Sequence, residues 1–227
     1  GPNVVIGANT GTAGAQKVTQ ASQFTGSGVG SAGSTVTVNG GTTVDVATTG
    51  GSVFVGSAAI ANGAVAVPTG AVTINDTFSG ANTASGDTFA VLGGSTVTIN
   101  VPNTTAFGFA VGAAPVLNAT GTALANAALS PTGDVTINNG TNNTAITAAA
   151  TVFTNGARTV SLTGLASAGG GSIIADVNSF ANAALTAVGV SALATVNLTN
   201  VGGVVSIDYN AITNLNITNR LKASATT

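Results

Sequence analysis

Six aspartates are the only acidic residues in this chain of 227 residues, so they carry whatever carboxylate chemistry it has. Three of them stand in turn-like sequence beside Gly or Asn, namely Asp76 in INDTFSG, Asp87 in SGDTF and Asp134 in PTGDV. Calcium takes hard oxygen ligands of this kind from loops. These three residues are therefore our candidate calcium ligands. A purely structural role as Asx-turn or cap residues is the alternative.

The residue types that most other kinds of catalysis require are missing from this chain. The chain has no His, Cys, Glu, Met or Trp, which excludes Ser-His-Asp and Cys-based nucleophilic catalysis and sites for soft metals. A glycosidase needs two carboxylates facing a cleft, and an aromatic platform for a sugar is missing because Tyr209 is the only Tyr. We therefore predict that the protein is not an enzyme, with a carbohydrate-active enzyme as a minor alternative.

Charge is scarce in this chain and limits its partners. The cations Lys17, Arg158, Arg220 and Lys222 leave a net charge of -2, and charged residues make up 4% of the chain, against about a quarter in ordinary globular proteins. Four scattered cations cannot form a groove for nucleic acid. No apolar run is long enough to predict a membrane-spanning helix. Because the sequence opens on Gly1-Pro2 without a start Met, we expect it to be a piece of a longer protein.

Internal repeats organise the sequence. GSTVTVN at 33–39 is echoed by GSTVTIN at 94–100 and by GARTVSLTG at 156–164. Two further markers recur in the same order: ANGAV at 61–65 with ANAAL at 125–129 and 181–185, then PTGAVTIN at 68–75 with PTGDVTIN at 131–138 and LATVNLTN at 193–200. The copies recur about every 62 residues, and a fixed period of this length is typical of stacked repeats. It predicts units at 33–93, 94–156 and 157–227, the last one degenerate, after the tail of a preceding unit, or a linker, at 1–32.

The local pattern is that of β-strands. Short, β-branched, alternating segments separated by Gly, Asn-Gly and Pro-Thr-Gly turns predict many short strands. They are TVTVN, TTVDVA, SVFVG, AVTIN, TFAVL, STVTINV, FGFAV, DVTIN, RTVSLTG, TVNLTN, VVSIDY and LNITN. Two Ala-rich segments, 121–130 and 178–194, lack alternation and are candidates for short helices.

These features predict an all-β fold that is a repeat-built β-solenoid, a β-helix-like stack of short strands forming one continuous structure. Such stacks place identical side chains above one another about 4.8 Å apart. The asparagines that end key strands are therefore expected to bond along a ladder or to terminate the strands at turns; they are Asn39, Asn75, Asn100 and Asn138. A β-sandwich with internal repeats is the alternative fold.

The TVTVN, AVTIN, TVNLTN and LNITN strands, with almost no charge and no Cys, resemble the β-strand-repeat regions of Gram-negative surface-layer (S-layer) proteins and large type I-secreted adhesins. The resemblance is one of composition and strand texture from about residue 33 onward. It implies an extracellular location on the bacterial cell surface, a structural role, self-assembly into a lattice or fibre, and calcium dependence. The calcium-binding nonapeptide of such proteins and their C-terminal export signal are not found in this sequence.

Two functional classes follow from the sequence. The leading hypothesis is a structural, self-assembling segment of a secreted bacterial surface-layer protein. The alternative is an adhesin or biofilm-matrix module that binds a glycan, such as a cell-surface polysaccharide, or an abiotic surface. An ice-binding solenoid is a further minor alternative, because Thr-x-Thr occurs at Thr35/Thr37 and at Thr96/Thr98.

Overall fold

The described residues form a stack of sixteen short strands in two eight-stranded sheets. The computed structural model describes residues 3–20, 35–60, 63–77, 87–101, 108–121, 123–140, 149–165, 171–178, 191–208 and 211–218. The odd-numbered strands form one sheet: β1 (Val4–Ile6), β3 (Thr35–Val38), β5 (Ser52–Val55), β7 (Thr88–Val91), β9 (Gly108–Val111), β11 (Ala149–Thr154), β13 (Ser172–Asp176) and β15 (Val205–Asp208). The even-numbered strands form the other: β2 (Gln16–Gln20), β4 (Val44–Thr48), β6 (Val72–Asp76), β8 (Val97–Asn100), β10 (Val135–Asn138), β12 (Thr159–Thr163), β14 (Thr195–Thr199) and β16 (Asn214–Thr218).

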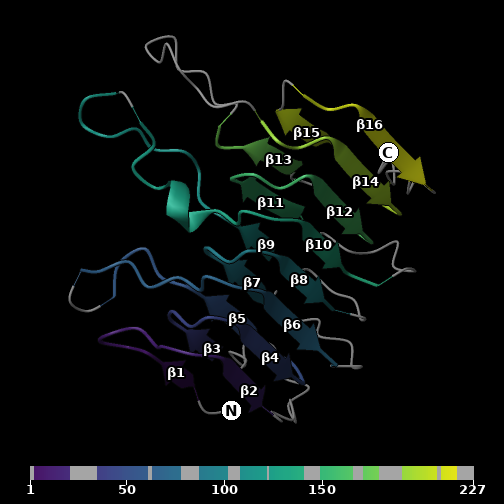
Figure 1. Ribbon diagram of the computed structural model, residues 1–227. Helices are drawn as coiled ribbons and strands as arrows, with labels where there is room; N and C mark the ends of the chain where they lie inside the picture. The colour runs from purple at the N-terminus through teal and green to yellow at the C-terminus, as the bar shows by residue number, and fades with distance from the viewer. Residues whose placement is uncertain are drawn as a thin grey trace.

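The chain alternates between the two sheets, so each coil contributes one odd and one even strand (Figure 1). Every pairing between these strands is parallel, and the coils rise in sequence order from β1 and β2 to β15 and β16. Parallel neighbours reached by crossing to the opposite sheet define a β-solenoid. The predicted solenoid is thus confirmed, and a sandwich of hairpin-connected strands does not describe the chain.

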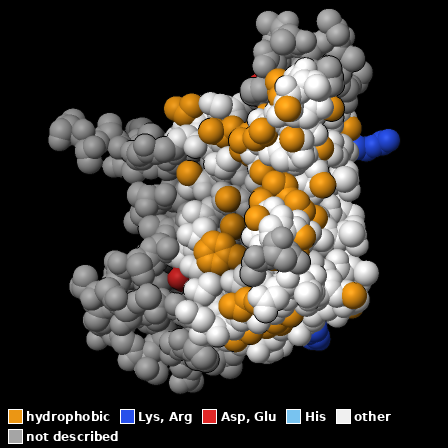
Figure 2. Space-filling view, turned by 90° about the vertical axis from the view of Figure 1, so that its left-hand side faces the viewer, with side chains coloured by type: hydrophobic (Ala, Val, Ile, Leu, Met, Phe, Trp, Pro, Cys, Tyr) orange, Lys and Arg blue, Asp and Glu red, His pale blue; other side chains and the backbone are white. Residues whose placement is uncertain are grey.

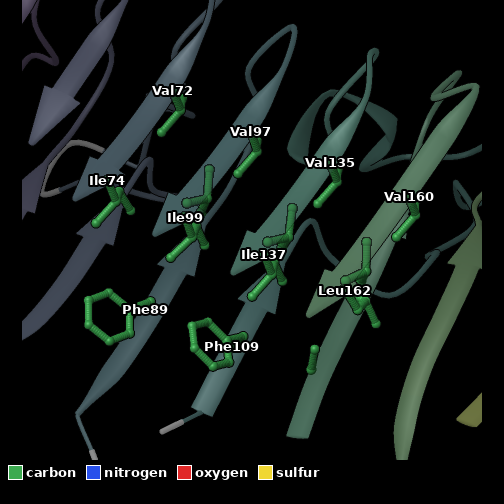
Figure 3. Close-up of a cluster of buried hydrophobic side chains, with 14 of the residues drawn as sticks. Val72, Ile74, Phe89, Val97, Ile99, Phe109, Val135, Ile137, Val160 and Leu162 are labelled. Carbon is green, nitrogen blue, oxygen red and sulfur yellow. The ribbon is translucent and has the colours of Figure 1, made fainter. Parts of the chain in front are cut away.

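Alternation within the strands produces the core. In β4, for example, Val44, Val46 and Thr48 are buried while Asp45 and Ala47 between them are half-buried, so one face of the strand points inward. Register stacks these inward residues into columns, of which the labelled side chains in Figure 3 show the central part: Val72, Val97, Val135 and Val160, with Ile74, Ile99, Ile137 and Leu162 beside them. Phe89 and Phe109 of the opposite sheet stack with their ring centroids 5.7 Å apart.

Two kinds of corner alternate at the entry to the even strands. A Gly-Gly corner precedes β4 and β8, and all four glycines have φ between 77° and 102°, which L side chains adopt at a cost. A Pro-Thr-Gly corner precedes β6 and β10. Adjacent corners bond to each other, since Thr69 N donates to Gly41 O (3.1 Å) and Ser95 N donates to Gly70 O (2.9 Å). The alternation has a period of two coils.

This alternation gives the 62-residue period a physical meaning. The PTGAVTIN, PTGDVTIN and LATVNLTN markers form β6, β10 and β14, which lie in one sheet with one coil between each pair. GSTVTIN forms β8 and GARTVSLTG forms β12, also two coils apart. GSTVTVN, however, forms β3 in the opposite sheet. The structural counterpart of GSTVTIN two coils earlier is the GTTVDVA segment of β4, because Val44, Val72 and Val97 share one column.

The twelve strands predicted from alternation are all present as β3 to β10, β12, β14, β15 and β16. Four were not predicted: β1 and β2 in the N-terminal segment, and β11 and β13. The helix expected at 121–130 is a single 3-10 turn, Ala127–Leu129. Asn126 bonds to Val116 N (2.8 Å) and Ala114 O (2.6 Å) and so closes this segment as a loop. The second Ala-rich segment lies mostly outside the described residues.

Candidate functional site

The outer face of the even sheet carries ladders of side-chain amides. Asn100 Nδ2 donates to Asn75 Oδ1 (2.8 Å), and Asn138 Nδ2 donates to Asn100 Oδ1 (2.8 Å). The ladder expected from the sequence therefore exists for three of the four asparagines. Asn39 lies outside it at the end of an odd strand, where its Nδ2 donates to Gly7 O (3.2 Å).

A second ladder was not predicted. Asn216 Nδ2 donates to Asn197 Oδ1 (2.8 Å), and Asn197 Nδ2 donates to Ser161 Oγ (3.0 Å). The register of β12, β14 and β16 aligns these three residues in one outward column. The sequence signal was available in TVNLTN and LNITN, but only the register shows which asparagines are neighbours.

Together the outward positions of β6 to β16 form a flat, neutral grid of hydroxyls and amides, which we call the polar face. One column holds Thr73, Thr98, Thr136, Ser161, Asn197 and Asn216, and the next holds Asn75, Asn100, Asn138, Thr163, Thr199 and Thr218. Neighbouring strands in a sheet lie about 4.8 Å apart and alternate residues along a strand about 6.6 Å apart. The polar face therefore presents regularly spaced hydrogen-bonding groups without charge.

The odd sheet has a less polar exterior. Its central outward column contains Val5, Phe54 and Ile173, whose side chains are 56%, 36% and 41% exposed.

Figure 2 shows the side of the stack where the 3-10 turn lies, and the visible surface there is a mixture of uncharged polar groups and apolar groups with very few charged side chains. Little electrostatic repulsion therefore opposes the approach of a second molecule.

The last described coil leaves part of the core open. Leu215 and Ile217 of β16 continue the columns of Val196 and Leu198, yet they are 50% and 56% exposed. An apolar groove of about 160 Å³ lies against them, lined also by Val205 and Ile207 of β15. Among the described strands, β15 and β16 each pair with one neighbour only. We call this surface the β15–β16 end face.

At the opposite end of the described stack, β2 is more polar than β16, although β1 beside it is apolar. β2 contributes Val18 to the core, but Gln16 and Gln20 take the inward positions on either side of it, and Lys17 is exposed. A lysine and amides on a terminal strand discourage uncontrolled edge pairing. The last described even strand, β16, therefore exposes apolar side chains at inward positions, whereas β2 does not.

Two of the three candidate calcium ligands come together. Asp76 ends β6 and Asp87 precedes β7, and both are buried, at 2% and 4% exposure. Asp76 Oδ1 accepts from Gly50 N (2.8 Å) and Asp87 Oδ2 accepts from Gly51 N (3.3 Å). These consecutive amides belong to the tight β4–β5 corner. The two carboxylates thus meet at one place, although they are separated in sequence.

Asp134 lies elsewhere. It is exposed at the start of β10, where its Oδ1 accepts from Thr159 N (2.8 Å) and Arg158 N (3.1 Å). This arrangement links β10 to the next strand of the sheet and has the character of a cap. In the part of the chain that the structure describes, no three acidic, His or Cys side chains gather into a group that could hold a metal ion.

The described residues contain no helix with the length and apolar character needed to cross a bilayer. Comparison of the chain with known protein families, with curated proteins and with solved structures finds no match.

Proposed function

We propose that this chain is a structural segment of a secreted bacterial surface-layer protein, and that it self-associates on the cell surface. The observation that carries the proposal is the β15–β16 end face, where Leu215 and Ile217 stand in core columns yet are half exposed. Exposed apolar groups beside strand edges with a single neighbour favour pairing with a further strand.

The coil-to-coil interface shows what such pairing requires. Every coil meets the next through parallel backbone bonds and through stacked apolar side chains such as Val160 on Val196 and Leu162 on Leu198. A coil from a second copy placed on β15 and β16 would continue this same interface. Because the interface is repeated along the whole stack, association needs no new recognition chemistry.

The absence of His and Cys from the sequence and the low charge fit a passive, chemically unreactive material. We assign the protein no catalytic role. We place the protein outside the cell because the texture of its strands resembles that of surface-layer repeat regions.

Sedimentation velocity over a range of concentrations tests the proposal. We expect the wild-type chain to form larger species with rising concentration and the double variant Leu215→Asn/Ile217→Asn to stay monomeric. Ile173→Asn is the matched control, because it replaces a similarly exposed apolar residue on an outward face. Assembly that persists in the double variant, or a wild type that stays monomeric throughout, would contradict the role of the end face.

The polar face favours a second candidate function, an adhesin module that binds a neutral polysaccharide. Its hydroxyls and amides both donate and accept hydrogen bonds, as sugar hydroxyls do, and its columns carry no charge from β6 to β16. The two Thr-x-Thr motifs that suggested ice binding lie in different sheets, Thr35/Thr37 in β3 and Thr96/Thr98 at β8.

Co-sedimentation with insoluble cellulose and chitin tests this second candidate. Thr98→Lys and Thr136→Lys place charge at the centre of the polar face, and Thr151→Lys places the same charge on the outward face of the odd sheet. Loss of binding in the first two variants alone supports the polar face as the binding surface. Equal binding by all three variants, or no binding by the wild type, contradicts it.

A further inference from the structure

The meeting of Asp76 and Asp87 at the β4–β5 corner goes beyond what a capping role requires. One carboxylate has two oxygen atoms and could accept from both amides of such a corner. Here two carboxylates, each more than nine-tenths buried, bond to the consecutive amides of Gly50 and Gly51. Carboxylates removed from water together repel each other and lose hydration, so buried clusters of this kind are stabilised by a positive charge among them.

Thr48 provides an independent observation at the same place. Its side chain is 2% exposed, and its Oγ1 is buried without a hydrogen-bond partner. Thr48 and Asp76 are register partners on β4 and β6, and both side chains point inward. A buried hydroxyl without a partner costs about 1–3 kcal/mol. The unsatisfied oxygen therefore lies on the inward side chain next to Asp76 in the same column.

The same column continues beyond Thr48. Gln20 of β2 is the register partner of Thr48, and it is 8% exposed. Three consecutive coils thus bring an amide, a hydroxyl and a carboxylate to one inward edge of the even sheet, and Asp87 joins them from the odd sheet. The two neighbouring inward columns of β6, β8 and β10 are apolar, with Val in one and Ile in the other. A cluster of polar side chains inside a core of Val and Ile indicates that a specific ligand binds there.

We propose that Asp76, Asp87 and Thr48 form a binding site for a single calcium ion. All three offer hard oxygen atoms, which calcium prefers, and they come from three separate segments, namely the end of β4, the end of β6 and the residue before β7. Magnesium requires a tighter octahedral shell and gives up its water reluctantly, so a partly dehydrated protein site of mixed oxygens favours calcium. A bound ion would fasten β6 and β7 to the β4–β5 corner. Asp134 takes no part, because it lies exposed at the other end of the strands.

Isothermal titration calorimetry and thermal unfolding of the full chain, first stripped of metal with chelator, test the site. We expect one calcium per chain and an increase in the unfolding temperature on adding calcium, with a weaker response to magnesium. Asp76→Asn and Asp87→Asn keep an oxygen that can accept from Gly50 or Gly51, so the fold should persist. Each is expected to reduce calcium affinity at least about tenfold.

Two further variants keep the test decisive. Thr48→Val is close in shape, and it should lower calcium affinity while leaving the metal-free protein as stable or more stable, because it removes the unsatisfied hydroxyl. Asp134→Asn is the matched control and should bind calcium as the wild type does. The site is overturned if the wild type shows no calcium response, if Asp134→Asn alone abolishes binding, or if magnesium and calcium act equally. The measurement is made on dilute monomer, so its outcome is separate from that of self-association.

Discussion

The Nδ2 group of Asn100 donates to Oδ1 of Asn75 across 2.8 Å, and Asn138 makes the same bond to Asn100 at the next coil. Asn100 therefore takes part in two amide bonds, while Asn75 and Asn138 each take part in one bond of this ladder. Parallel, in-register stacking places identical side chains directly above one another, so that their amide groups can hydrogen-bond along the stack.

This difference predicts a graded loss of stability. Asn100→Ala removes two bonds and should lower the free energy of unfolding by about 2 kcal/mol, while Asn75→Ala and Asn138→Ala should each cost about 1 kcal/mol. Chemical denaturation of the three variants measures the difference. Equal losses at the three positions would show that the ladder does not contribute bond by bond.

The Pro-Thr-Gly corners predict a steric requirement for glycine. Gly70 and Gly133 have ordinary φ values, but a β-carbon at either would collide with a backbone carbonyl of the neighbouring coil, that of Thr42 or Ser95. We expect Gly70→Ala and Gly133→Ala to cost about 3 kcal/mol each, since a backbone oxygen cannot move aside as a side chain can.

Gly14→Ala is the control for these glycines. Gly14 has φ +78°, and a β-carbon at this position would have no atom within 4 Å, so the substitution costs only the strain of a left-handed backbone, about 1 kcal/mol. Thermal unfolding compares the three variants. A loss at Gly14 as large as that at Gly70 would mean that backbone conformation, and not the approach of the coils, governs the corner.

The stacked phenylalanines predict that the inward Phe89 contributes more to the free energy of unfolding than the outward Phe54 does. Phe89 is fully buried with its ring 5.7 Å from that of Phe109, whereas Phe54 is 36% exposed on the outward face. Phe89→Ala should lower the free energy of unfolding by about 3–5 kcal/mol. Phe54→Ala should lower it by about 1–2 kcal/mol, because 36% of its surface is already in contact with water. Urea unfolding distinguishes them, and similar losses would contradict the assignment of inward and outward faces.

The two-strand coil predicts which deletions the fold accepts. Removing residues 97–134 takes out one coil and joins Thr96 to Val135, which restores a TVTIN strand in the even sheet. Since coils contact only their neighbours, the shortened protein should keep its β circular dichroism and unfold cooperatively at a lower temperature.

A deletion longer by one residue is the control. Removing 97–135 joins Thr96 to Thr136 and shifts the alternation, so that Thr136 and Asn138 turn inward and Ile137 turns outward. This variant should lose cooperative unfolding. Identical behaviour of the two deletions would contradict the register on which the core columns depend.

Alternation in the sequence was sufficient to find strands with β-branched residues, because burial of one face leaves a period of two in segments such as VTIN. It failed for QKVTQ of β2, where Val18 is the single apolar residue, and for the Ala-rich start of β11. These segments are strands because a neighbouring coil supplies their backbone partners, which no local pattern records.

The candidate sites, too, could be predicted from the sequence only in part, because they depend on which residues are neighbours in space. GSTVTVN and GSTVTIN look equivalent, but nothing in seven residues tells which of two sheets a strand enters. Likewise Asp76 and Asp87 were each identified as oxygen ligands, yet their meeting at Gly50 and Gly51 depends on how strands of the two sheets approach one corner. Thr48 was missed because an inward Thr in a strand resembles any other until its unsatisfied hydroxyl is seen.

Electron microscopy of the purified chain, with calcium and with chelator, tests the proposed self-association most directly. The β15–β16 end face predicts filaments or sheets whose repeat along the stack follows the coil spacing of about 4.8 Å, and it predicts that the Leu215→Asn/Ile217→Asn variant forms none. Dispersed single particles of the wild type under both conditions and at all concentrations would contradict the structural role proposed for this protein.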